Sequence, residues 1–175
     1  MPIQLLRCRP EHEGEVISAI REFSLANPEF TFAHGYRDGV PFAEYVTELE
    51  KMEQGEVPEG WTPATFLFAW SGTRVVGRVS FRHRLTPHLE RVGGHIGYAV
   101  LSSERRKGFA TEILRQSLSL ARAQGLSRVL LTCDFDNEGS IRTIERNGGV
   151  LENTVTDPSV PKPKRRYWID LSSLG

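Results

Sequence analysis

The feature that most constrains the fold of this chain is a strand–helix–strand unit near its middle. Residues 95–100 predict a strand, the apolar positions between Ala110 and Ala121 recur at helical spacing up to a stop at Gly125, and residues 128–135 predict a second strand. A helix that connects two neighbouring strands in this way makes them parallel. The N-terminus of the helix then lies at the carboxyl edge of the sheet, where ligands commonly bind.

The rest of the chain predicts one mixed α/β domain over residues 1–175, with a mixed, mostly antiparallel sheet and helices on both of its faces. A hairpin with its turn at residues 71–73 joins two strands rich in β-branched and aromatic residues. The predicted strands outside the central unit are 3–8, 64–70, 74–85, 150–155 and 166–171, and the predicted helices are 10–23, 41–49 and 140–146.

The strand at 74–85 is predicted to have two different faces, because successive side chains of a strand point to opposite sides. Polar positions alternate with largely apolar ones along it, namely Arg78, Ser80, Arg82 and Arg84 against Val79, Phe81 and His83. We therefore expect the arginine-bearing face in water and the other face packed on the core.

Composition argues against several functions. Lys plus Arg and Asp plus Glu both number 22, so net charge gives no general attraction to nucleic acid or to an anionic membrane. The apolar stretches are far shorter than the ~20 residues of a membrane helix, and no signal peptide is recognised. Cys8 and Cys133 have no spacing that suggests a metal site or a redox pair. We expect a cytoplasmic protein with no metal and no nucleic-acid or membrane partner.

A basic, glycine-containing segment begins the central helix, where residues 105–111 read Arg-Arg-Lys-Gly-Phe-Ala-Thr. N–H groups at a helix start lack intrahelical partners and the helix dipole is positive there, so this segment suits an anion. Gly108 and Ala110 let a phosphate approach the backbone. The segment is neither a Walker loop nor a G-x-G-x-x-G motif. Composition alone leaves two interpretations open, phosphate binding and a solvated basic turn.

The order Arg105-x-x-Gly108-x-Ala110 matches R/Q-x-x-G-x-G/A, the pyrophosphate-binding motif of the GNAT superfamily of acetyltransferases. The similarity continues through the strand at 95–100, the strand that contains Cys133 and Asp134, and the segment 137–148. Together with Gly93–Tyr98 and the terminal Tyr167-Trp168-Ile169-Asp170, these motifs resemble a bacterial subgroup of predicted acetyltransferases with no defined acceptor.

The resemblance implies acetyl-CoA as co-substrate and an amine of a small molecule or peptide as acceptor. It also implies that the two parallel strands splay apart and hold the pantetheine arm between them like an added strand. An N–H near Val100 would polarise the thioester carbonyl as an oxyanion donor. The residues implied to contact the cofactor are Ala99, Val100, Leu101, Arg105, Arg106, Lys107, Gly108, Phe109, Ala110, Thr111, Asn137 and Ser140.

Direct attack by an amine needs a base, because an amine with a pKa of ~10.4 is protonated at neutral pH. Many superfamily members carry Glu where this chain has His95, so His95 is the predicted base; the alternative is a histidine packed or hydrogen-bonded within the sheet. His83 is a second candidate for the base.

Ile144 replaces the tyrosine that often protonates the leaving thiolate, which leaves the acid unassigned. Cys133 has no visible base, so transfer in a ternary complex is preferred to an acyl-enzyme.

Other functions compete with catalysis. A GNAT-like domain that lacks the tyrosine could bind acyl-CoA as a sensor without turnover. Nucleic-acid binding through residues 162–166 is weakly supported, because proline breaks this loop and no aromatic residues are interleaved. The final strand would pair between the subunits of a homodimer or lie inside one sheet. Acceptor specificity is expected from residues 28–39 and 86–92.

Overall fold

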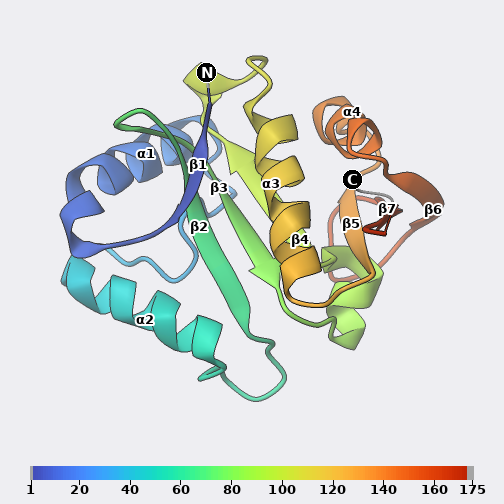
Figure 1. Cartoon of the computed structure of the whole chain (residues 1–175), viewed down its shortest axis with the longest axis horizontal. Helices are drawn as coiled ribbons and strands as arrows, with labels where there is room; N and C mark the ends of the chain where they lie inside the picture. Colours follow the sequence, from blue (N-terminus) through green and yellow to red (C-terminus); the bar gives the residue numbers. More distant parts are fainter. Residues whose placement is uncertain (1, 173–175) are drawn as a thin grey trace.

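The computed structural model describes residues 2–172; the ends of the predicted domain 1–175, residue 1 and residues 173–175, lie outside this range. Over the described residues, seven strands form two antiparallel sheets and four α-helices pack against them (Figure 1). None of these helices combines the length and the apolar character that crossing a lipid bilayer requires.

The first sheet is built around the predicted hairpin. β2 and β3 pair antiparallel, β1 adds to the free edge of β2, and β4 adds to the free edge of β3. In sheet order the strands are β1 Gln4–Arg7, β2 Ala64–Ser71, β3 Arg74–Arg82 and β4 Ile96–Val100.

Helices cover both faces of the first sheet, as predicted (Figure 1). Alternate side chains of β2 belong to two separate cores: Phe66 and Phe68 pack with α1 and α2, whereas Leu67 and Ala69 pack with α3. Because burial of both sets stabilises the fold, the sheet needs helices on each side. These helices are α1 Glu13–Ala26, α2 Phe42–Gln54 and α3 Phe109–Ala123.

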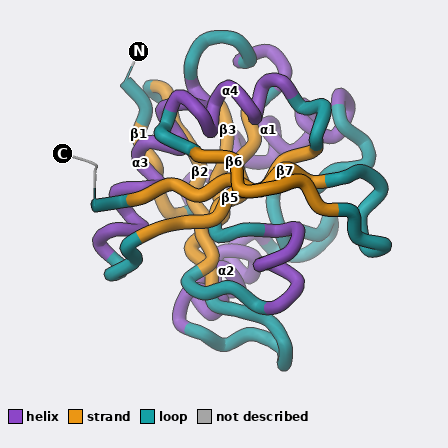
Figure 2. Tube along the Cα trace, turned by 90° about the vertical axis from the view of Figure 1, so that its right-hand side faces the viewer, coloured by secondary structure: helices purple, strands orange, loops and turns teal. Residues whose placement is uncertain are grey.

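The second sheet has the order β5-β7-β6 and lies at one side of the molecule, with α4 beside it (Figure 2). Its elements are β5 Arg128–Asp134, α4 Glu138–Arg146, β6 Val150–Val155 and β7 Lys164–Asp170. The final strand pairs with β5 on one side and with β6 on the other. It therefore lies inside one sheet and offers no open edge for pairing with a second subunit.

The two sheets come together where β4 and β5 begin. The N–H of His95 donates to the carbonyl of Leu130 at 2.7 Å. Gly94 has a φ of 68°, and a Cβ added to it would lie 2.6 Å from the same carbonyl oxygen, so glycine is required for this approach. Past this contact β4 and β5 form no ladder. The predicted strand pair therefore diverges from a contact at its base and leaves a gap.

The prediction of a solvated arginine face on the strand at 74–85 is wrong for two of its arginines. Arg84 is exposed, but Arg78 and Arg82 are partly covered. The segment between α1 and α2 packs over this face of β3, and Arg78 donates to the carbonyl of Thr31 in that segment at 3.3 Å. Alternation along a strand distinguishes its two faces but does not say what covers them.

Candidate functional site

The gap between the sheets opens into a cavity of about 820 Å³, which we call the central cleft. The cleft extends from the end of β4, past the start of α3, to the first turns of α4. Phe23 and Asn27, at the end of α1, and Arg78 of β3 complete its wall.

The start of α3 suits this cleft to an anion. Gly108 is the N-cap residue with a φ of 84°, and no side chain caps the N–H groups that follow it. Gly108, Phe109, Ala110 and Thr111 all line the cleft. Arg106 also has a positive φ, 62°, which curls the loop before the helix. Open N–H groups at the positive end of a helix dipole form a binding site for phosphate.

Besides Arg78 of β3, arginines from the loop before α3 and from α4 line the cleft, in a chain whose net charge is zero. Arg105 and Arg106 come from the loop before α3, and Arg142 and Arg146 lie one helical turn apart on α4. Nη2 of Arg105 donates to the side chain of Asn27 at 3.0 Å, which ties the loop to the end of α1. Within the described part of the chain, five arginines and one carboxylate, that of Glu104, line the cleft, so positive charge exceeds negative charge there.

The edge of β4 that faces β5 carries backbone groups without a strand partner. At one end of β4 the N–H of Leu101 donates to β3 at 3.0 Å, and at the other end the carbonyl of His95 accepts from β3 at 2.7 Å. The register between these two bonds is unbroken. Because backbone groups alternate in direction along a strand, the N–H groups of Tyr98 and Val100 point toward the gap.

The start of α4 forms the opposite wall. Asn137 caps this helix, and its side-chain oxygen accepts from the N–H of Ser140 at 3.1 Å. The hydroxyl of Tyr98 reaches across the cleft and donates to the carbonyl of Ser140 at 3.5 Å. Burial raises the pKa of Tyr98 to about 12, so the hydroxyl keeps its proton at neutral pH.

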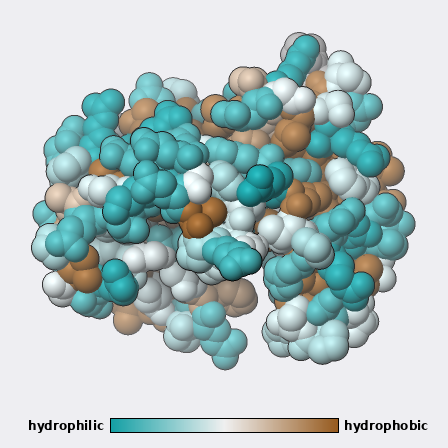
Figure 3. Space-filling model, turned by 90° about the horizontal axis from the view of Figure 1, so that it is seen from below, coloured by the Kyte–Doolittle hydropathy of each residue, from teal (hydrophilic) through white to brown (hydrophobic). Residues whose placement is uncertain are grey.

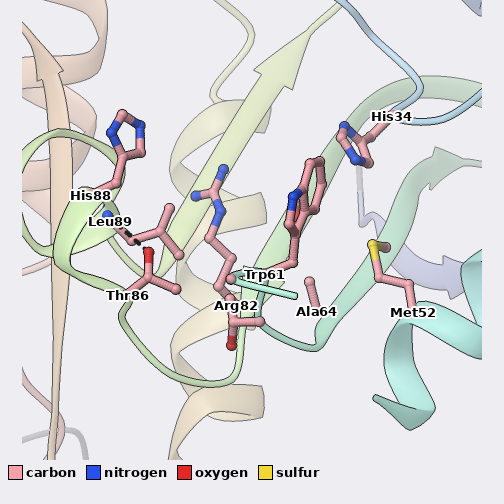
Figure 4. Close-up of a pocket in the computed structure, with 11 residues that line it drawn as sticks. His34, Met52, Trp61, Ala64, Arg82, Thr86, His88 and Leu89 are labelled. Atoms are coloured by element: carbon pink, nitrogen blue, oxygen red, sulfur yellow. Dashed lines mark hydrogen bonds between the residues drawn. The ribbon is translucent and has the colours of Figure 1, made fainter. Parts of the chain in front are cut away.

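A second cavity of about 430 Å³, which we call the side cavity, lies farther along the same face of β3. Ser80 and Arg82 line it, two and four residues past Arg78 of the central cleft. The guanidinium of Arg82 stands between His88 on one side and Trp61 on the other (Figure 4). Seen from below, the surface is hollowed between the two halves of the molecule (Figure 3). The full lining is His34, Met52, Gly60, Trp61, Thr62, Ala64, Ser80, Arg82, Thr86, His88 and Leu89.

The pattern of the Acetyltransferase (GNAT) family matches residues 30–149, a stretch that holds the start of α3, the exposed edge of β4 and the first turns of α4. The chain belongs to the GNAT acetyltransferase family. It is therefore an acyltransferase by family.

Individual GNAT proteins resemble it to different extents. The uncharacterized N-acetyltransferase YjdG of Bacillus subtilis is 36% identical over 59 residues, which are 33% of this chain and 35% of the relative. The microcin C7 self-immunity acetyltransferase MccE, solved with acetyl-CoA and AMP, has a TM-score of 0.68 at 20% identity over 96% of this chain and 92% of that one. The Salmonella typhimurium acetyltransferase of ribosomal protein L7/L12 has a TM-score of 0.69 at 16% identity over 96% and 94%. These two structures share the fold.

The central cleft brings together most of the residues that the GNAT resemblance implied. Leu101 and Lys107 do not line it. Leu101 is 1% exposed within the core beside α1 and α2, and the ammonium of Lys107 lies 2.8 Å from Glu104. The implied residues that do line the cleft are Ala99, Val100, Arg105, Arg106, Gly108, Phe109, Ala110, Thr111, Asn137 and Ser140.

Several residues that line the central cleft were not among those expected from the sequence. The sequence could have predicted Arg142 and Arg146 as a pair, because two arginines at i, i+4 spacing lie on the same face of a helix. Strand alternation predicts Tyr98 on the face opposite His95 and therefore argues against it as the acid, yet Tyr98 lines the cleft. Arg78 had no signal, since its position in the cleft depends on the segment that covers β3.

The geometry of His95 matches the alternative to a base, which is a histidine hydrogen-bonded within the sheet. Its Nδ1 accepts from the N–H of Leu130 at 2.9 Å, so the ring carries its proton on the other nitrogen. Burial, and then the charge of Arg82, lower the pKa of His95 to about 4. His95 is 6% exposed and lines neither cavity. Nothing in this arrangement favours His95 as a base.

His83 and Cys133 likewise line neither the central cleft nor the side cavity. Nε2 of His83 lies 2.9 Å from the hydroxyl of Thr65. Burial raises the pKa of Cys133 to about 11, so this thiol is a poor nucleophile at neutral pH.

Proposed function

We propose that the protein is an N-acetyltransferase that moves the acetyl group of acetyl-CoA to a primary amine of a small molecule or peptide, by direct attack while both substrates are bound. The observation that carries this proposal is that the uncapped start of α3 and the free edge of β4 open into one cleft. The first suits the phosphates of coenzyme A, and the second suits a thioester carbonyl. Acetyl-CoA supplies the activated acyl group.

We assign the binding of coenzyme A to three parts of the central cleft. The N–H groups from Phe109 to Thr111 suit the pyrophosphate. Arg142 and Arg146 suit a further phosphate, because their guanidinium groups present forked donors. The free edge of β4 suits the amide groups of the pantetheine arm, which would add to it as a strand does.

The proton donor that we assign is Tyr98. Ile144, which stands in place of the common tyrosine, is 1% exposed in the core and presents no polar atom to the cleft. The hydroxyl of Tyr98 lies on the cleft wall and is protonated at neutral pH, since burial raises its pKa to about 12. It can therefore supply a proton to the leaving thiolate while the N–H of Val100 polarises the carbonyl.

The base that we assign is His34, which lines the side cavity in the segment between α1 and α2. Burial, followed by the charges of Arg82 and Arg78, lowers the pKa of His34. The ring is therefore neutral at pH 7 and can accept a proton from an amine, directly or through water. His95 instead acts as a positioning residue that holds the start of β4 against β5.

A non-catalytic sensor would need a site for acyl-CoA alone. The side cavity, which follows the central cleft along β3, favours transfer to a second substrate. Homodimer formation and a cytoplasmic location stay predictions.

The proposal is tested by titrating the protein with acetyl-CoA in a calorimeter. Thr111→Glu adds a carboxylate at the start of α3, where it favours the helix but repels the pyrophosphate; Thr111→Gln is the matched neutral control. We expect Thr111→Glu to weaken binding at least ~10-fold and Thr111→Gln to bind within a few-fold of the wild type. Release of free thiol with a panel of amines then measures turnover. Absence of acetyl-CoA binding by the wild type would contradict the proposal.

A further inference from the structure

Two arginines converge over Gly97 of β4. A Cβ added to Gly97 would lie 3.4 Å from Nη1 of Arg82 and 3.8 Å from Nη1 of Arg78, although the two arginines are four residues apart on β3. The absence of a side chain at Gly97 leaves room for both guanidinium groups. Two like charges are therefore held close to the same point.

Neither arginine has a carboxylate partner among residues 2–172. Nη1 of Arg82 donates to the carbonyls of Gly93 and Gly94, both at 3.3 Å. Arg78 donates only to carbonyl oxygens, and its Nε is buried with no hydrogen-bond partner. Neutral carbonyl groups satisfy some of the donors but do not neutralise the two charges.

Both side chains nevertheless remain charged. Burial, followed by the neighbouring charge of Arg82, lowers the pKa of Arg78 to about 10, which is still far above neutrality. Burial also lowers the pKa of Arg82. Burying unpaired like charges is unfavourable, and an oxyanion bound next to them would offset that cost.

Arg82 is open to a ligand on its cavity side. Among the described residues, its Nε and Nη2 have no hydrogen-bond partner, and the guanidinium extends into the side cavity (Figure 4). This forked pair of donors matches the two oxygens of a carboxylate. Met52, Trp61 and Leu89 give the same cavity an apolar wall, and about 430 Å³ suits a small molecule or a chain end.

We infer that the acceptor carries an oxyanion beside its amine, most simply the carboxylate of an amino acid or of a closely related molecule, and that this group binds Arg82 in the side cavity. Arg78 adds its charge from the other side of Gly97. The inference rests on the proposed function and names its substrate class. The apolar wall holds the carbon skeleton of the acceptor, and His34, which also lines the cavity, receives the proton of its amine.

The test measures binding without turnover. The protein, saturated with coenzyme A, is titrated with a set of N-acetyl-amino acids and with the matching N-acetyl-amino-acid amides, which differ only in the anion. Inorganic phosphate and O-phosphoethanolamine form a separate arm that distinguishes a phosphate from a carboxylate. We expect at least one acid to bind ten-fold or more tightly than its amide.

The variants are chosen so that loss of folding is not mistaken for loss of the site. Arg82→Gln removes the charge, and Arg84→Gln removes an exposed arginine just past the end of β3 as a control. Because Arg82 also holds two carbonyls, Ser80→Asp is a second variant, which places a carboxylate in the side cavity next to Arg82; Ser80→Asn is its neutral control. We expect Arg82→Gln and Ser80→Asp to abolish the preference for the acid, and the two controls to retain it.

Each outcome decides the inference. Equal binding of acids and amides, no binding of any anion, or a preference that survives in both Arg82→Gln and Ser80→Asp would overturn it. Tighter binding of the phosphates would keep the oxyanion site and exclude the carboxylate as its ligand. An enzyme that binds acetyl-CoA and acetylates neutral amines as well as amino acids would keep the proposed function while rejecting this substrate class. Failure to bind acetyl-CoA would instead remove the proposed function, and anion binding at Arg82 would still be measured.

Discussion

His95 and Leu130 exchange two hydrogen bonds across the junction of the sheets: the N–H of His95 donates to the Leu130 carbonyl at 2.7 Å, and Nδ1 of His95 accepts from the Leu130 N–H at 2.9 Å. Leu130 is fully buried, so its backbone has no access to water. This pair fixes the point from which β4 and β5 diverge, and therefore the base of the central cleft.

The first prediction concerns stability at low pH. The folded pKa of His95, about 4, lies below its ordinary value of 6.5, so the unfolded chain binds more protons between these values. Stability is therefore lost as the pH falls from about 6.5 through 4. His95→Asn keeps an acceptor near the Nδ1 position but does not titrate, so we expect urea unfolding to show a weaker loss over this range. An unchanged pH dependence in His95→Asn would contradict the assignment.

Removing the Nδ1 acceptor of His95 altogether should lower the stability of the fold more than His95→Asn does. His95→Ala leaves the buried N–H of Leu130 without a partner and opens a small cavity, and we expect a loss of about 3 kcal/mol in the free energy of unfolding. Chemical denaturation beside His95→Asn measures the difference. A loss equal to that of His95→Asn would mean that the hydrogen bond contributes little.

Gly94 should tolerate no side chain. Gly94→Ala places a methyl group 2.6 Å from the carbonyl oxygen of Leu130 at a φ of 68°. Gly72 has a similar φ, 62°, and open space around it, so Gly72→Ala measures the backbone strain alone. We expect Gly72→Ala to cost about 1 kcal/mol and Gly94→Ala at least about 2 kcal/mol more. Equal losses in thermal unfolding would show that β4 and β5 can separate at no cost.

Tyr98→Phe should slow transfer without weakening the binding of acetyl-CoA. The substitution removes only the hydroxyl that donates to Ser140 on the cleft wall. We expect kcat to fall roughly 100-fold with an unchanged Kd for acetyl-CoA, measured by thiol release and by calorimetry. A parallel loss of cofactor affinity would assign the hydroxyl to binding instead of proton transfer.

His34→Gln should change the pH profile. The pKa of His34 is lowered from 6.5 by burial and by two arginines, and a base must be neutral to act. Wild-type kcat/KM is therefore expected to rise as the pH rises through a value below 6.5, and this limb should disappear in His34→Gln together with most of the activity. His88→Gln alters the other histidine of the same cavity and serves as the control. A limb that persists in His34→Gln would point to another base.

The sequence by itself determined the features that depend on residues close along the chain. Gly108 and its flanking cations predict an anion site because the N–H groups of a helix start belong to consecutive residues. The strand–helix–strand order predicts a parallel pair with that site at its edge, and the GNAT resemblance implies that the pair diverges. Belonging to the GNAT family follows from the same local motifs.

The tertiary structure alone decided what the remaining polar residues do, because it depends on which distant segment covers each face. Alternation placed Arg78 and Arg82 on one face of a strand, but only packing of the segment between α1 and α2 makes that face a cavity wall. The sequence left His95 as either a base or a hydrogen-bonded histidine of the sheet, and the structure gives its Nδ1 a partner in the N–H of Leu130, 35 residues away in the sequence. A hydrogen bond between residues so far apart is set by how the two sheets dock, which no short pattern records.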